Sequence, residues 1–392
     1  MGVLRQFLRH PHQLWFRRCN FQIHLWTGVI LALYLVVIGV TGSILVFGAE
    51  LEQLVNPSPW PRIDRAQRVA DLATVVHSLA TRYPHTHIVS ITAPTSIEPV
   101  FTAVLQTAKQ ISVACQPSTG EVLGEINREP SRLQWIYDLH ENLLAQRSGR
   151  VANGIGALAL LLMALTGLIN WWPGLQSWRR ALSIDFRRRW RRVNYDIHSA
   201  VGFWTLALLV VWASSGVYFT WPDRFLALVN HLSPLVNSRP PMVVVHPNTD
   251  IAPLDFRAML AKAYAVDPGA RWEAVFFPAS RRSPFEMLMS RSTSRDREDT
   301  LFFNPYNGQY ISTWQYGVNK SLGDWIVWLQ VPLHFGTHWG LAFKCLWAAF
   351  GLALPVLAIT GLLMYWNRFL SKKWPAANRR FLPVSTRKPY NS

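Results

Sequence analysis

Four histidines lie where long apolar segments meet polar sequence, and they form two pairs. His24 and His198 stand at the head of the first and third apolar segments. His140 and His334 stand shortly before the second and fourth. Ionisable side chains close to a membrane interior are costly and commonly functional, and two neutral imidazoles on one haem iron make an electron carrier. We therefore predict two haem b groups, one bound by each pair.

Other residues near these histidines admit more than one interpretation. A single interfacial histidine is better explained by its polar tip reaching the headgroups, whereas four paired ones favour ligation. His338 follows His334 by one helical turn and is an alternative ligand or a propionate contact. Arg150 and Lys344 lie near the ends of the second and fourth apolar segments, where haem propionates or lipid phosphates are both suitable partners.

The elements that must position these side chains are four segments long enough to cross a bilayer. A spanning helix needs about 20 mostly apolar residues. Three of the four segments contain no charged side chain, and the fourth contains only Lys344. The segments are residues 25–47, 151–172, 200–221 and 341–366. We therefore expect a four-helix transmembrane bundle with the histidine pairs near its two ends.

Basic residues predict the orientation of this bundle. Three segments next to the spans hold almost the whole net charge of +17, and they are residues 1–20, 174–197 and 367–392. Short basic segments beside spans stay in the cytoplasm, so both termini are expected there. The rest of the chain is nearly neutral, so nucleic acid is not an expected partner. Anionic membrane lipids are the expected contacts of the basic segments.

The chain has two halves with matching residues, which indicates an internal duplication. One gap-free register aligns Asn20, His24, Gly28 and Gly42 with Asn194, His198, Gly202 and Gly216. A second aligns His140, Thr166 and Gly167 with His334, Thr360 and Gly361. Glycines in the spans favour close helix packing and also leave room for a porphyrin, and the sequence does not separate the two explanations.

The two long connections between spans are each the size of a small domain. Helices are expected at residues 67–83 and 254–266, with β-rich segments after each. The expected strands are residues 88–92, 100–106, 111–115 and 122–126 in the first connection, and 272–277, 285–289 and 300–303 in the second. Each connection is therefore expected to form an α+β domain on the side opposite the termini.

The expected organisation follows from these segments. It comprises a cytoplasmic N-terminus (1–24), a first span (25–48), a first outer domain (49–135), an outer helix and second span (136–173), a basic cytoplasmic loop (174–197), a third span (198–221), a second outer domain (222–325), an outer helix and fourth span (326–366), and a cytoplasmic C-terminus (367–392).

Several motifs resemble those of one family. The two span heads end in Asn-Phe-Gln-Ile-His24 and Asn-Tyr-Asp-Ile-His198, and Thr-Gly-Leu occurs at 166–168 and 360–362. The outer connections carry turns at 117–123 and 304–308. With these motifs the chain resembles the PepSY-associated transmembrane family of bacterial inner-membrane proteins. That resemblance implies PepSY-like domains in the periplasm.

The resemblance also extends to inner-membrane siderophore reductases, and it implies a function. It predicts a di-haem oxidoreductase that passes electrons from an unidentified cytoplasmic donor to a periplasmic ferric siderophore. Hard oxygen ligands hold Fe(II) more weakly than Fe(III), so one-electron reduction releases the metal. Two alternatives are an envelope regulator or protease-inhibiting membrane protein without catalysis, and a haem oxidoreductase acting on quinol or a periplasmic cupric complex.

Overall fold

The computed structural model describes residues 15–55, 57, 60, 70–95, 98–107, 110–126, 132–237, 241–243, 254–290, 298–336 and 339–371. The chain divides into two compact units. The first comprises residues 1–46, 136–222 and 341–392, and the second comprises residues 47–135 and 223–340. His338 and the basic side chains of residues 1–14 and 372–392 lie outside the described residues.

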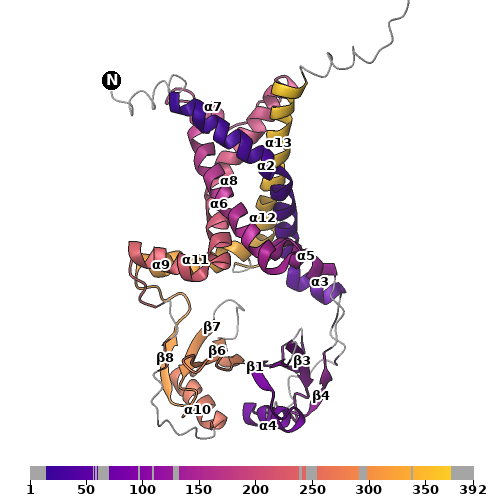
Figure 1. The fold of residues 1–392 in the computed structure, drawn as a ribbon, viewed down its shortest axis with the longest axis vertical. Helices are drawn as coiled ribbons and strands as arrows, with labels where there is room; N and C mark the ends of the chain where they lie inside the picture. The colour runs from indigo at the N-terminus through magenta and orange to yellow at the C-terminus, as the bar shows by residue number, and fades with distance from the viewer. Residues whose placement is uncertain are drawn as a thin grey trace, which may run out of the picture. The chain divides into compact units, whose positions relative to one another are not determined.

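The first unit contains four helical segments long and apolar enough to cross a membrane (Figure 1). They are α2 (Trp15–Leu45), α6 (Gln146–Trp171), α8 (Trp190–Thr220) and a fourth made of α12 (Leu341–Gly351), α13 (Ala353–Tyr365) and the π-helical turn Trp366–Leu370. Each predicted span therefore coincides with a helix. Ile30 and Leu33 of α2 are both 77% exposed, as suits side chains that face lipid.

The fourth span is interrupted at Leu352, between α12 and α13. Pro355 follows closely, and proline lacks the N–H that would donate back to the preceding turn. α2 passes this break closely, because a Cβ on Gly39 would lie 2.6 Å from Cδ of Pro355 and 2.8 Å from Cβ of Leu354. Small residues thus let the first and fourth spans approach each other.

The four spans form a closed ring. α2 packs against α6 and α13, and α8 packs against the same two helices. α2 and α8 are therefore diagonal neighbours across the interior. The core between the spans consists of Ala32, Leu35, Leu160, Leu209, Ala213, Leu354 and Ala358.

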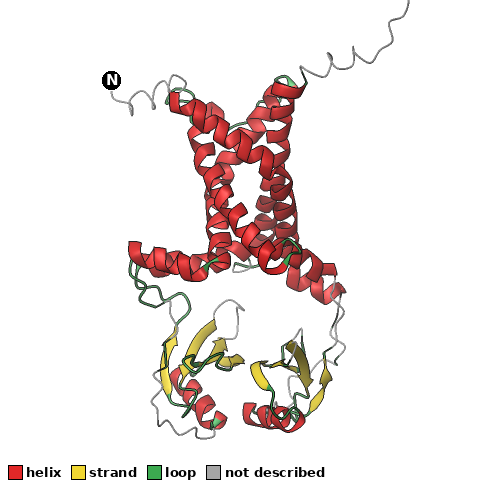
Figure 2. Ribbon diagram, viewed as in Figure 1, coloured by secondary structure: helices red, strands yellow, loops and turns green. Residues whose placement is uncertain are grey.

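The described strands all belong to the second unit, where one element order occurs twice (Figure 2). The first copy is α4 (Leu72–Arg82), β1 (His87–Thr92), β2 (Phe101–Gln106), β3 (Gln110–Cys115) and β4 (Val122–Glu125). The second copy is α10 (Phe256–Val266), β5 (Arg271–Phe276), β6 (Phe285–Ser290), β7 (Glu298–Phe303) and β8 (Tyr310–Trp314). β8 was not among the predicted strands.

The two copies share one eight-stranded sheet in the order β4-β3-β2-β1-β5-β6-β7-β8. Its centre is the antiparallel pair of β1 and β5, in which Ser90 faces Phe276 and Ile91 faces Val275. The two expected outer domains are therefore joined edge to edge. This junction gives both first strands a partner, which a strand at a sheet edge otherwise lacks.

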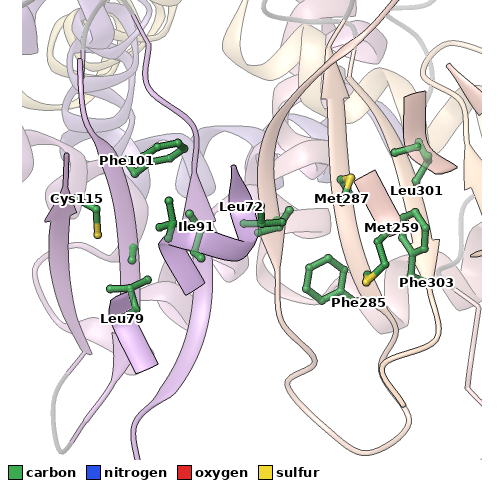
Figure 3. Close-up of a cluster of buried hydrophobic side chains, with 14 of the residues drawn as sticks. Leu72, Leu79, Ile91, Phe101, Cys115, Met259, Phe285, Met287, Leu301 and Phe303 are labelled. Carbon is green, nitrogen blue, oxygen red and sulfur yellow. The ribbon is translucent and has the colours of Figure 1, made fainter. Parts of the chain in front are cut away.

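A single hydrophobic cluster runs through this sheet and its two helices (Figure 3). Leu72 and Leu79 of α4 lie in it with Phe101 of β2, and Met259 of α10 lies in it with Phe285 of β6. All five side chains are at most 2% exposed. The shared core indicates that the two copies fold as one body.

Five further helices complete the described chain. They are α3 (Gly48–Val55), α5 (Arg132–Asn142), α7 (Trp178–Ala181), α9 (Pro222–Leu232) and α11 (Leu322–Phe335). α5 and α11 correspond to the outer helices predicted before the second and fourth spans.

Candidate functional site

His24 and His198 lie next to each other inside the ring of spans. Their ring centroids are 6.3 Å apart, and the ring planes are nearly perpendicular at 86°. The two side chains come from α2 and α8, the diagonal helices of the ring. Both therefore reach the same point of the interior from opposite sides.

Each of these imidazoles is held through Nδ1 by a threonine on a neighbouring span. Nδ1 of His24 lies 3.1 Å from Oγ1 of Thr166 on α6. Nδ1 of His198 lies 2.9 Å from Oγ1 of Thr360 on α13. These contacts leave Nε2 of each ring as the nitrogen available to a ligand.

An asparagine one turn before each histidine holds the same threonine by its backbone. Nδ2 of Asn20 donates to the carbonyl of Thr166 over 2.9 Å. Nδ2 of Asn194 donates to the carbonyl of Thr360 over 3.0 Å. Each asparagine–histidine pair therefore contacts both the main chain and the side chain of one threonine. The repeated spacing of these asparagines was visible in the sequence, but it suggested no role for them.

Glycines leave space for the two rings. A Cβ on Gly167 would lie 3.2 Å from Cε1 of His24, and one on Gly361 would lie 3.4 Å from Cε1 of His198. One turn after each histidine stands another glycine, Gly28 or Gly202. Side chains of neighbouring spans pack against these two positions, because a Cβ on Gly28 would lie 3.2 Å from Cε of Met163 and one on Gly202 would lie 3.6 Å from Cδ2 of Leu357.

His140 has the same kind of environment near the other end of α2. Its Nδ1 lies 3.0 Å from Oγ1 of Thr41, and a Cβ on Gly42 would lie 2.9 Å from its Cε1. Burial lowers the pKa of His140, which lies on α5 outside the spans, to about 4. A neutral imidazole is the form that binds a metal.

A second set of contacts fixes the end of α5 that carries His140. Nδ2 of Asn153 donates to the carbonyls of His140 at 2.8 Å and Glu141 at 3.0 Å. The hydroxyl of Tyr34 donates to Oδ1 of Asn153 at 2.7 Å. Next comes a tight corner in which Leu143, Leu144 and Gln146 have positive φ angles of 50°, 61° and 50°. Through this corner α5 folds back so that His140 reaches α2.

A family model described as the PepSY-associated TM region matches residues 21–368. The chain belongs to this family. The match covers His24, His140 and His198 together with the threonines that hold them. No curated protein matches the chain, so the assignment to the PepSY-associated family names no substrate.

The remaining predicted site residues have separate surroundings in this family member. Arg150 forms an ion pair with Glu141, the residue after His140. Lys344 is buried in α12, at 9% exposure. His334 lies on α11 of the second unit, whereas His140 belongs to the first. The pairing of His140 with His334 stays a prediction.

The geometry of His24 and His198 fits a haem iron between them. A metal–imidazole bond is about 2.0 Å, so two rings bound in line to one ion have centroids about 6 Å apart. The observed separation is 6.3 Å. Within the described residues no group of three or more His, Cys, Asp or Glu side chains is placed to hold a bare metal ion. Two histidines suffice for haem, because the porphyrin supplies the other four ligands.

Proposed function

We propose that this member of the PepSY-associated family is a di-haem oxidoreductase of the bacterial inner membrane. In this proposal it carries electrons from the cytoplasmic side to periplasmic ferric siderophores and releases Fe(II). The observation that carries the proposal is the His24–His198 pair, with ring centroids 6.3 Å apart inside the bundle. A regulator without a redox group gives no reason for two imidazoles to face each other there.

The residues of the bundle have distinct roles in this proposal. His24 and His198 would hold the inner haem through Nε2, and Thr166 and Thr360, which contact Nδ1 of each ring, would orient them. Gly167 and Gly361, which lie against the two imidazoles, would leave the histidine rings room beside their helices. Bound haem would supply a one-electron carrier, and the protein would supply its position and surroundings.

The length of α2 supports a second haem near the opposite end of the bundle. Thr41, which contacts His140, follows His24 by about 26 Å of helix at 1.5 Å rise per residue. Such a distance covers most of the hydrocarbon core of a bilayer, about 30 Å. We assign His140 to the outer haem, with His334 as its proposed second ligand.

The proposed orientation places the His24–His198 site near the cytoplasm. Arg17 donates to the carbonyls of Asn170 at 2.6 Å and Trp172 at 2.9 Å, at the same end of the bundle. The exposed, arginine-rich segment between α6 and α8 begins at this end. Short basic segments of this kind stay in the cytoplasm. An alkaline phosphatase fused after Arg192 should be inactive in cells, and one fused near residue 290 should be active. The reverse pattern would contradict this orientation.

The proposed substrate follows from the chemistry of iron. Siderophores bind Fe(III) through hard oxygen atoms, and the reduced ion is bound far more weakly. A protein that delivers one electron outside the membrane therefore needs no catalytic side chain on the iron itself. The second unit would supply the surface that receives the complex.

The test uses purified protein without oxygen. The protein is reduced with dithionite, desalted, and mixed with a ferric hydroxamate and a ferrous chelator. Reoxidation of the haem together with capture of Fe(II) is the expected result. Haem that stays reduced for minutes with several classes of siderophore would contradict siderophore reduction and favour quinol or another substrate.

A further inference from the structure

Three histidines of the first unit share one arrangement of hydrogen bonds. In each case a threonine hydroxyl contacts Nδ1, and the threonine is followed by glycine. The pairs are His24 with Thr166, His198 with Thr360 and His140 with Thr41. Each hydroxyl also donates to the carbonyl four residues earlier in its own helix. These carbonyls are Leu162 at 2.8 Å, Val356 at 2.6 Å and Val37 at 2.7 Å.

This second bond decides which ring nitrogen carries the proton. A threonine hydroxyl has one hydrogen and two acceptor lone pairs. Since its hydrogen points to a carbonyl, the oxygen acts as acceptor toward the imidazole. Nδ1 must therefore be the N–H, and Nε2 must carry the free lone pair.

We propose that Thr166 and Thr360 are positioning residues of the inner haem, an inference that rests on the proposed function. They present Nε2 of His24 and His198 to the iron, and they make both imidazoles stronger electron donors. An acceptor on the distal N–H of a ligating histidine raises the basicity of the ligand. A more basic ligand stabilises Fe(III), so the two threonines lower the reduction potential of the inner haem.

Asn20 and Asn194 add a further restraint to the threonines of the inner site. By holding the carbonyls of Thr166 and Thr360, they restrict how far each threonine can move away from its histidine. The residue one turn before His140 is Ile136, which has no side-chain donor. The contacts of Thr166 and Thr360 with their histidines are therefore held more rigidly than the contact of Thr41 with His140.

A purely structural role for the threonines makes a different prediction. Valine has nearly the shape of threonine but lacks the hydroxyl, so helix packing alone would survive Thr166→Val and Thr360→Val. Serine keeps the hydroxyl and loses only a methyl group. The two substitutions therefore separate hydrogen bonding from packing.

The experiment measures the midpoint potential and the rate of haem loss to apomyoglobin in the purified full-length chain. The double variant T166V/T360V should have a higher inner-haem potential than the wild type and lose that haem on the order of 10–100-fold faster. The serine pair T166S/T360S should return both quantities toward wild type. Thr41→Val is the matched control and should change only the other haem.

Each result decides between the alternatives. An unchanged inner-haem potential in T166V/T360V, or an equal change in the valine and serine pairs, would overturn the positioning role and leave the proposed function intact. Loss of the inner haem in the valine pair but not in the serine pair would support it. A wild-type protein without haem would overturn the proposed function, and this inference with it.

Discussion

Adding one methyl group beside each histidine should disturb the haem sites in a graded order. Gly42, Gly167 and Gly361 occupy equivalent positions, each next to a threonine that contacts a histidine. A Cβ on these glycines would lie 2.9, 3.2 and 3.4 Å from the nearest imidazole carbon, respectively. Carbon atoms pack at about 3.5–4.0 Å, so alanine forces shifts of at least about 0.6, 0.3 and 0.1 Å.

These shifts can be compared with the displacement that a binding site tolerates before it loses its ligand. A functional constellation must be held within about 0.5 Å of its productive geometry. Gly42→Ala exceeds that limit, so the outer haem that we assign to His140 should be lost on the order of 10–100-fold faster, as when a supporting contact is removed. Gly167→Ala should give an intermediate effect on the inner haem. Gly361→Ala should retain both haems.

The assay is transfer of haem to apomyoglobin, followed by absorbance in purified variants. The matched control is built into the series, because all three changes add the same methyl group to a transmembrane helix. Equal rates for Gly361→Ala and Gly42→Ala would refute the reasoning. So would a Gly42→Ala protein that retains both haems with wild-type kinetics.

Three further predictions concern the supports of the site and the sheet. Gln146→Gly should stabilise the first unit by about 0.5–1 kcal/mol in thermal unfolding, because glycine adopts a positive φ without strain; a lower melting temperature would contradict this. Tyr34→Phe should cost about 1 kcal/mol and speed loss of the outer haem only, since Asn153 loses its donor; faster loss of the inner haem would count against it. Asp71→Ala should cost about 1 kcal/mol, because it removes the cap of α4. Hydrogen bonds from Thr74 lower the pKa of Asp71, so its contribution to stability should be fully present at neutral pH and decrease as the pH falls from about 4 through that lowered pKa; a mutational cost that does not decrease below about pH 4 would contradict this.

The sequence was informative wherever the signal is local. Long apolar runs predicted the four spans, and short β-rich segments predicted seven of the eight strands. β8 (Tyr310–Trp314) follows the turn at 304–308 as β4 follows the turn at 117–120, so the repeat itself would have revealed it. Its β-branched and aromatic residues are typical of a strand.

The junction of β1 with β5 could not be predicted from the sequence. Either strand could be an ordinary edge strand in a separate domain. The residues of β1 and β5 do not indicate which other strand each one pairs with. Pairing between segments so far apart depends on the three-dimensional packing of both copies. The continuous core around Met259 and Phe101 arises from the same packing.

The candidate site likewise has a part that the sequence predicts and a part that depends on three-dimensional packing. The repeat in the sequence already pairs His24 with His198. Thr166 and Thr360 were visible only as matching letters, because their role depends on which span faces which histidine. The contact of His140 with Thr41 depends on the left-handed corner at Leu143–Gln146, and glycine, the usual signal for such a corner, is absent there.

The central claim is that each chain binds two haems and that His24 and His198 hold one of them. The most direct measurement is the haem content per chain, by pyridine haemochrome and dithionite-reduced spectra, of the wild type and of H24A/H198A purified from haem-replete cells. We predict two haems in the wild type and one in the double variant, with the remaining haem still reducible. A colourless wild type, or a double variant that retains two haems, would contradict the account.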